Sequence, residues 1–118
     1  SIAHGTDGII LVYNGFDKKQ SASLEKYASR IGKDLTSQQV LVVAHKIGET
    51  EGKVSRPKLP KALEDARVVA ADVRENFGAF IDTFDVFAAQ LYQIKLRKIE
   101  EKEKQMLGEP EKRPEDAQ

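Results

Sequence analysis

The chain has 118 residues, and its 19 Lys and Arg balance its 19 Asp and Glu, so the formal net charge is zero. This balance argues against the basic surface that nucleic acids and acidic membranes require. The absence of Cys excludes a disulfide framework, a thiolate zinc site and a cysteine nucleophile. The length allows one domain at most, and no apolar run approaches the roughly 18 residues that a membrane span needs.

The first part of the chain predicts a buried strand followed by an amphipathic helix. Residues 8–14 form a continuous apolar run rich in β-branched side chains, which is typical of a parallel strand covered on both faces. Residues 17–23 then supply several candidates for a helix N-cap. Apolar residues follow at helical spacing, namely Leu24, Tyr27, Ala28 and Ile31. Gly32 comes next and is typical of a helix C-terminus.

The middle of the chain predicts two more strands separated by a long loop. Residues 39–44 form a second, fully apolar strand. Residues 46–60 are expected to be a loop because they contain two Gly and two Pro, with one helical turn over residues 60–65. Residues 67–71 form a third, shorter strand. Apolar strands that alternate with helices predict the α/β class, with a parallel sheet and right-handed crossovers.

A long helix is predicted from near Glu75. Its apolar residues keep a period of about 3.6 for five turns. They are Phe77, Phe80, Ile81, Phe84, Phe87, Ala88, Leu91 and Ile94. We expect this stripe to lie in the core, with a hydrophobic cofactor groove as the remote alternative.

The C-terminal quarter is dominated by charge. Residues 95–107 alternate Lys and Glu over a thin apolar stripe, so we expect the last helix to extend into solvent. A docking helix for a coiled-coil partner is the alternative, because such helices also have flanks of mixed charge. Residues 108–118 have the composition of a disordered tail, which gives a domain over 1–107.

Three strands with two helices make an incomplete domain. Both faces of the sheet need cover, and an edge strand as apolar as residues 8–14 is a hazard for unwanted pairing. We therefore interpret the chain as the second half of a doubly wound α/β domain.

The candidate ligand-binding residues are the polar ones that follow the second and third strands. In open α/β sheets, ligands bind outside the carboxyl ends of the strands. The second strand ends in His45-Lys46-Ile47-Gly48 and the third in Ala71-Asp72-Val73. Two simpler interpretations remain open: strand ends that become polar on reaching solvent, and Asp72 as the N-cap of the last helix. His4 and His45 are too few for a metal site, and no catalytic set is apparent.

These segments resemble the C-terminal half of a Ras-like GTPase. Residues 7–14 resemble the fourth strand of that fold, and His45-Lys46-Ile47-Gly48 occupies the place of the Asn-Lys-x-Asp base-reading motif. Ala71-Asp72-Val73 takes the place of the Ser-Ala-Lys loop. A closer resemblance is to the Rab-like small GTPase subunits of intraflagellar transport complex B, through residues 7–14, the Ala44-His45 strand ending, the missing guanine-reading Asp and the long loop that follows.

The resemblance implies the C-terminal half of a Ras-like, doubly wound P-loop NTPase domain, with three mainly parallel strands and a long last helix. In the intact protein it implies a GTP or GDP site, with His45 and Lys46 beside the base. The backbone N–H groups of Ala71, Asp72 and Val73 would face the base oxygen.

The same resemblance implies a function. It points to a GTPase-like structural subunit of intraflagellar transport complex B that docks on coiled-coil subunits, the pair numbered seventy-four and eighty-one. Such a subunit acts in protein transport during assembly of the cilium or flagellum, and is located there and in the cytoplasm around the basal body. Nucleotide would stabilise the fold and the docking surface.

The departures from the GTPase pattern limit the chemistry that can be assigned. Gly48 cannot supply the guanine-reading carboxylate, and whether Glu49 or Glu51 replaces it stays open; the loss predicts a relaxed guanine preference. No Gly-x-x-x-x-Gly-Lys-Ser/Thr loop occurs in these residues, so no phosphoryl chemistry is assigned to any of them.

Two other functions remain as alternatives. One is a regulatory GTPase of the Rab or Ras type, with hydrolysis and switch cycling. The other is an unrelated flavodoxin-like or receiver-type half, which would need acidic strand ends that Asn14 and His45 do not provide.

Overall fold

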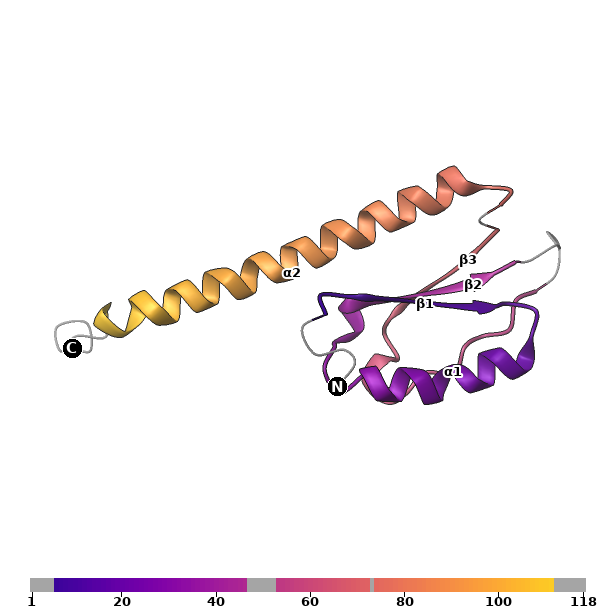
Figure 1. The fold of residues 1–118 in the computed structure, drawn as a ribbon, viewed down its shortest axis with the longest axis horizontal. Coiled ribbons are helices and arrows are strands. Elements are labelled where there is room, and N and C mark those ends of the chain that lie inside the picture. Colours follow the sequence, from indigo (N-terminus) through magenta and orange to yellow (C-terminus); the bar gives the residue numbers. More distant parts are fainter. Residues whose placement is uncertain (1–5, 47–52, 73, 112–118) are drawn as a thin grey trace.

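A three-stranded sheet lies between two helices in the computed structural model of the chain, which describes residues 6–46, 53–72 and 74–111 (Figure 1). The helices and strands are, in chain order, β1 (Ile9–Asn14), α1 (Lys18–Ile31), β2 (Val40–His45), β3 (Arg67–Ala71) and α2 (Phe77–Glu111). Two short 3₁₀ turns, η1 (Ser37–Gln39) and η2 (Lys61–Leu63), precede β2 and β3. The predicted α/β class and the predicted helical turn within 60–65 are confirmed.

The sheet has the order β1-β2-β3, and both strand pairs are parallel. The central strand β2 is buried from Val40 to Ala44. Because a central strand is covered by both neighbours and by both layers of helix, its run of apolar residues needs no polar alternation. The predicted parallel sheet and the buried second strand are therefore confirmed.

Helix α1 covers one face of the sheet. Asp17 caps the helix, and its carboxylate accepts the Lys19 and Gln20 N–H groups. Leu24, Ala28 and Ile31 are buried against this face, as predicted. Tyr27 is the exception. The buried row of α1 consists of Ser21, Leu24, Ala28 and Ile31, and Tyr27 lies to one side of this row, exposed to solvent.

The end of α1 also differs from the usual glycine pattern. Gly32 has φ −63°, so it keeps a right-handed conformation, and its N–H donates to the Ala28 carbonyl at 2.9 Å. The crossover from β2 to β3 uses the same face as α1, because Leu63 and Ala66 belong to the same apolar cluster. Both crossovers thus lie on one side of the sheet, which leaves the other side to α2.

Helix α2 covers the second face along a narrow line. Phe87 is buried against Leu41 and Val43, and Phe80 and Leu91 are half-buried beside it. The remaining aromatic residues of the predicted stripe, Phe77 and Phe84, are exposed. The expectation that the whole stripe lies in the core is therefore wrong, because one helix on three strands can bury only the row that points at the sheet.

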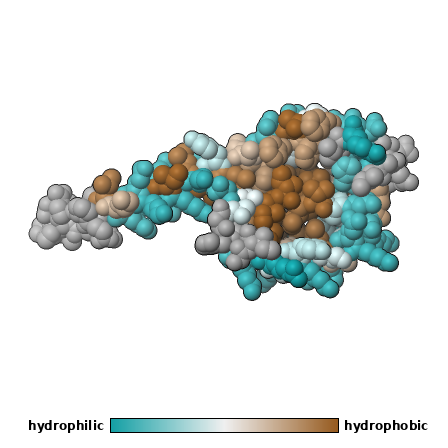
Figure 2. Space-filling model, in the orientation of Figure 1, coloured by the Kyte–Doolittle hydropathy of each residue, from teal (hydrophilic) through white to brown (hydrophobic). Residues whose placement is uncertain are grey.

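The edge strands are more exposed than predicted. Val12 of β1 is 57% exposed, and Val68 of β3 is 42% exposed. Burial on both faces was expected for the first strand, but Val12 lies outside the line that α2 covers. Figure 2 shows the result as an apolar area in the centre of the body, over β1 and toward the first half of α2.

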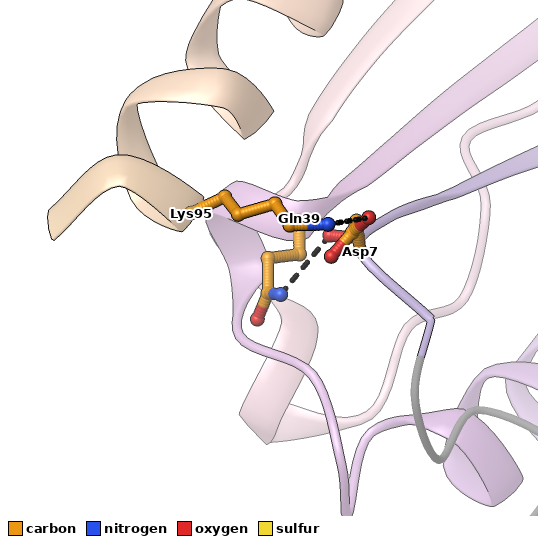
Figure 3. A network of polar contacts seen from close by, with 3 residues as sticks. All are labelled: Asp7, Gln39 and Lys95. Atoms are coloured by element: carbon orange, nitrogen blue, oxygen red, sulfur yellow. Dashed lines mark hydrogen bonds and ion pairs between the residues drawn. The ribbon is translucent and has the colours of Figure 1, made fainter. Parts of the chain in front are cut away.

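One polar network ties the start of β1 to α2 (Figure 3). The Lys95 ammonium lies 3.2 Å from the Asp7 carboxylate, and the Gln39 side-chain amide donates to the Asp7 carbonyl at 3.1 Å. Gly8 is close-packed at the same place, because a Cβ there would lie 2.5 Å from Leu91 Cδ1. These contacts mark where α2 leaves the body.

Beyond Lys95, α2 runs past the end of the sheet (Figure 1). The predicted extension of the last helix is confirmed, and it continues to Glu111, so residues 108–111 of the predicted tail are helical. Residues 112–118 lie outside the described residues. Among the helices that are described, none combines the length and the hydropathy that crossing a membrane requires.

Candidate functional site

The carboxyl ends of the strands form one row. The parallel register sets Asn14 beside His45, and His45 beside Ala71. Backbone hydrogen bonds continue the row past the strands: the Gly15 N–H donates to the His45 carbonyl at 2.8 Å, and the Lys46 N–H donates to the Ala71 carbonyl at 3.0 Å. His45, Lys46, Ala71 and Asp72 therefore lie at the same edge, as predicted from the sequence.

Some predicted residues cannot be placed at this edge. Val73, Gly48, Glu49 and Glu51 all lie outside the described residues. The backbone role proposed for Val73 and the two replacements for the guanine-reading carboxylate stay predictions.

The turn after β1 is built tightly onto this edge. A Cβ at Gly15 would lie 2.6 Å from Val54 Cγ1, so a larger residue would push Val54 and its loop away. The Gly15 carbonyl accepts the Ser55 N–H at 2.6 Å, which fastens the long loop to the strand end. Asn14 Oδ1 accepts the Phe16 N–H at 3.0 Å and thereby shapes the turn into α1. This turn could have been predicted from Asn14-Gly15, because Asn-Gly is a recognised turn signal.

A recess of about 300 Å³ lies where β3 meets the start of α2. Lys46, Ala71 and Asp72 line it, so three of the five predicted site residues share one concave surface. Glu75 and Thr83 add a carboxylate and a hydroxyl to this recess. Neither was predicted, because helical spacing does not reveal which face of α2 lies over β3. The volume is at the lower limit of small-molecule sites.

Asp72 has a local structural role that differs from the predicted one. Its carboxylate accepts the Arg74 and Glu75 N–H groups, at 3.0 and 3.3 Å. Helix α2 begins only at Phe77, and Asn76 immediately before it accepts the Ala79 N–H at 3.4 Å. The prediction that Asp72 caps α2 is therefore wrong: Asp72 closes the preceding turn, because four residues lie between Asp72 and the first residue of the helix, Phe77.

His45 carries an unsatisfied buried atom. Its imidazole Nδ1 is buried and has no hydrogen-bond partner within the part of the chain that the structure describes. Buried polar atoms in native proteins nearly always have a hydrogen-bond partner, so the unpaired Nδ1 at the end of β2 is unusual. His45 does not line the recess that Lys46 and Asp72 share, so His45 and Lys46, although adjacent in the sequence, lie in different surroundings.

A second groove lies on the α1 face beside β3 and has a volume of about 570 Å³. Tyr13, Ser55, Val68 and Ala70 are among its lining residues, and the Tyr13 hydroxyl donates to the Ser55 carbonyl. Burial raises the pKa of the Tyr13 phenol above its ordinary value of 10.0. Residues 53–60, which form neither helix nor strand, supply part of the wall of this groove.

The described residues show no metal centre: across 6–46, 53–72 and 74–111, His, Cys, Asp and Glu never gather in a group of three that could hold an ion. The charged side chains that line the recess at the carboxyl edge are those of Lys46, Asp72 and Glu75.

Comparison with known proteins adds no assignment, since no protein-family model, curated protein or solved structure matches the chain. The GTPase resemblance accordingly depends on the motif residues and on the strand arrangement described above.

Proposed function

We propose that this chain is the C-terminal half of a GTPase-like domain and serves as a non-catalytic structural subunit of intraflagellar transport complex B. In this role it docks on the coiled-coil subunits of the complex, in the cilium or flagellum and around the basal body. The observation that carries the proposal is the row formed by Asn14, His45 and Ala71, with Lys46 and Asp72 directly behind it. In the proposed resemblance, His45 and Lys46 correspond to the base-reading motif and Ala71 and Asp72 to the Ser-Ala-Lys loop, while Asn14 ends the neighbouring strand.

A weak or unselective nucleotide site fits the residues at this edge. Lys46 and Asp72 share a recess, whereas the fourth motif position is Gly48 and carries no carboxylate. Discrimination between bases depends on buried hydrogen-bonding partners, so guanine would be preferred only slightly over adenine. GTP or GDP would then stabilise the fold and the docking surface instead of driving a cycle.

The exposed apolar surface supports a half-domain. Phe77, Phe84 and Lys95 lie on one side of α2, because 7 and 18 residues correspond closely to whole helical turns. Lys95 contacts Asp7 just before β1, so this side of α2 faces the β1 edge. Val12, Phe77 and Phe84 are exposed apolar side chains, and Figure 2 shows an apolar area over β1 and toward the first half of α2. A further strand and helix would cover both parts of it.

The docking arm of the test uses the full-length protein co-expressed with the coiled-coil subunits and analysed by size-exclusion chromatography. Co-elution in a defined ratio supports the proposal. Elution of the protein by itself as a monodisperse species, separate from those subunits, would overturn the proposal.

The nucleotide arm measures fluorescent GTP and ATP binding to the same full-length protein. We expect Lys46→Ala to reduce the affinity at least about tenfold, because the lysine stem packs along a bound base in this fold, and the matched control Lys53→Ala to leave it unchanged. Tight binding of GTP alone, with turnover, would favour the regulatory Rab- or Ras-type GTPase instead.

A further inference from the structure

The C-terminal half of α2 carries an apolar seam that lies on another side of the helix than the row packed on the sheet. Its apolar positions follow heptad spacing, at Tyr92, Leu96, Ile99 and Met106. Ile99 is 44% exposed and Met106 is 76% exposed, and this segment extends past the sheet (Figure 1). The sheet-facing row of α2 ends near Leu91, so this seam belongs to a second face.

One position in the seam is charged. Glu103 falls four residues after Ile99 and three before Met106, where the heptad pattern demands an apolar side chain. A single charged residue at such a position selects the partner, because it must be paired when the seam closes. Lys95 and Lys102 flank the seam on one side and Glu100 on the other, so its charges are sorted by side.

A second copy of this chain is a poor occupant in either orientation. A parallel copy would bring the two Glu103 carboxylates together in the closed seam, and exposed pairs between Lys95 and Glu100 would compensate little. An antiparallel copy would place lysines against lysines along one flank. The charge pattern therefore excludes self-pairing and demands a complementary helix.

We propose that the distal seam of α2, formed by Tyr92, Leu96, Ile99, Glu103 and Met106, binds one helix of a partner protein that presents Lys or Arg opposite Glu103. The partner helix carries an acidic residue opposite Lys102, since Lys95 on the same flank already pairs with Asp7. Ile99, Glu103 and Met106 lie past Lys95, the last residue of α2 shown to contact the body, and Tyr92 before it is 64% exposed. This inference rests on the proposed function in one respect: that function identifies the complex that supplies the partner helix.

The test uses the full-length protein and two labelled helical peptides, each with Leu and Ile in its own seam and an acidic residue opposite Lys102. One peptide has Lys opposite Glu103 and the other has Glu at that place. In fluorescence anisotropy, we expect the Lys peptide to bind at least tenfold more tightly. Glu103→Lys should reverse this preference, whereas the matched control Glu101→Lys, on the outer side of the same helix, should leave it unchanged.

Three outcomes would overturn the inference: equal binding of the two peptides, a preference that survives Glu103→Lys, or self-association of the protein in analytical ultracentrifugation. Binding of the Ile99→Asp variant to the coiled-coil subunits distinguishes failure of the seam inference from failure of the proposed function. If that complex forms and neither Ile99→Asp nor Glu103→Lys weakens it, the seam inference fails while the proposed function stands. If no complex forms but the peptides discriminate through Glu103, the reverse holds.

Discussion

Truncation of the Phe residues of α2 tests whether the sheet decides which of them form the core. Phe87 is 6% exposed and packs on Leu41 and Val43, whereas Phe77 is 57% exposed on the same helix. Burying a Phe side chain contributes about 1.5–3 kcal/mol, and the cavity left by truncation adds to the loss. Phe87→Ala should therefore lower the free energy of unfolding by about 3–4 kcal/mol.

Phe77→Ala is the matched control, since it makes the same chemical change in the first turn of the same helix. Its side chain is mostly in solvent and Ala is the better helix former, so the free energy of unfolding should change by less than about 1 kcal/mol. With a urea dependence of about 1.5 kcal/mol per molar, the Phe87 variant should lose roughly 2 M in its unfolding midpoint.

The assay is urea unfolding followed by circular dichroism at 222 nm, with Phe84→Ala as a third variant. Phe84 is exposed and should resemble Phe77. Equal losses at the three positions, or a larger loss at Phe84 than at Phe87, would refute the arrangement of α2 on the sheet described above.

Three further predictions concern the α1 face and the β1 edge. Burial raises the pKa of Tyr13 in the folded state, so the contribution of its neutral phenol to stability should be complete below pH 10 and lost as the pH rises through the folded pKa. Tyr13→Phe should abolish this alkaline loss of stability, which thermal unfolding at a series of pH values measures. Asp17→Ala removes the cap of α1 and should cost about 1 kcal/mol in urea unfolding, whereas Asp7→Asn, which breaks an exposed ion pair, should cost no more than about 0.5 kcal/mol; similar losses would contradict the capping assignment. Gly8→Ala should destabilise the fold by about 1–2 kcal/mol through its clash with Leu91, and additive losses in the double variant with Leu91→Ala would argue against that contact.

Local pattern was enough to predict most of the elements. The continuous apolar runs predicted three strands whose bounds agree with β1, β2 and β3 to within a residue. A strand covered on both faces needs no polar alternation, and that property is visible in the sequence itself. The polar residues after β2 and β3 were also correctly expected to share one edge, because parallel strands end on the same side.

Burial, in contrast, was decided by the tertiary arrangement. Helical spacing placed Phe77, Phe84 and Phe87 on one broad stripe, yet only the sheet determines which of them it covers. The edge position of β1 likewise leaves Val12 in solvent, although its residue type and neighbours resemble those of β2.

The same division holds for the candidate site and for the distal seam. The sequence by itself determined which polar residues follow the strands and that the charged C-terminal segment continues the helix. Only the tertiary structure decided that Lys46 and Asp72 share a recess while His45 lies outside it, and that Ile99 and Met106 remain exposed on the part of α2 past Lys95. Periodicity records which residues share a face of a helix, but which face is covered depends on contacts between segments that are distant in the chain.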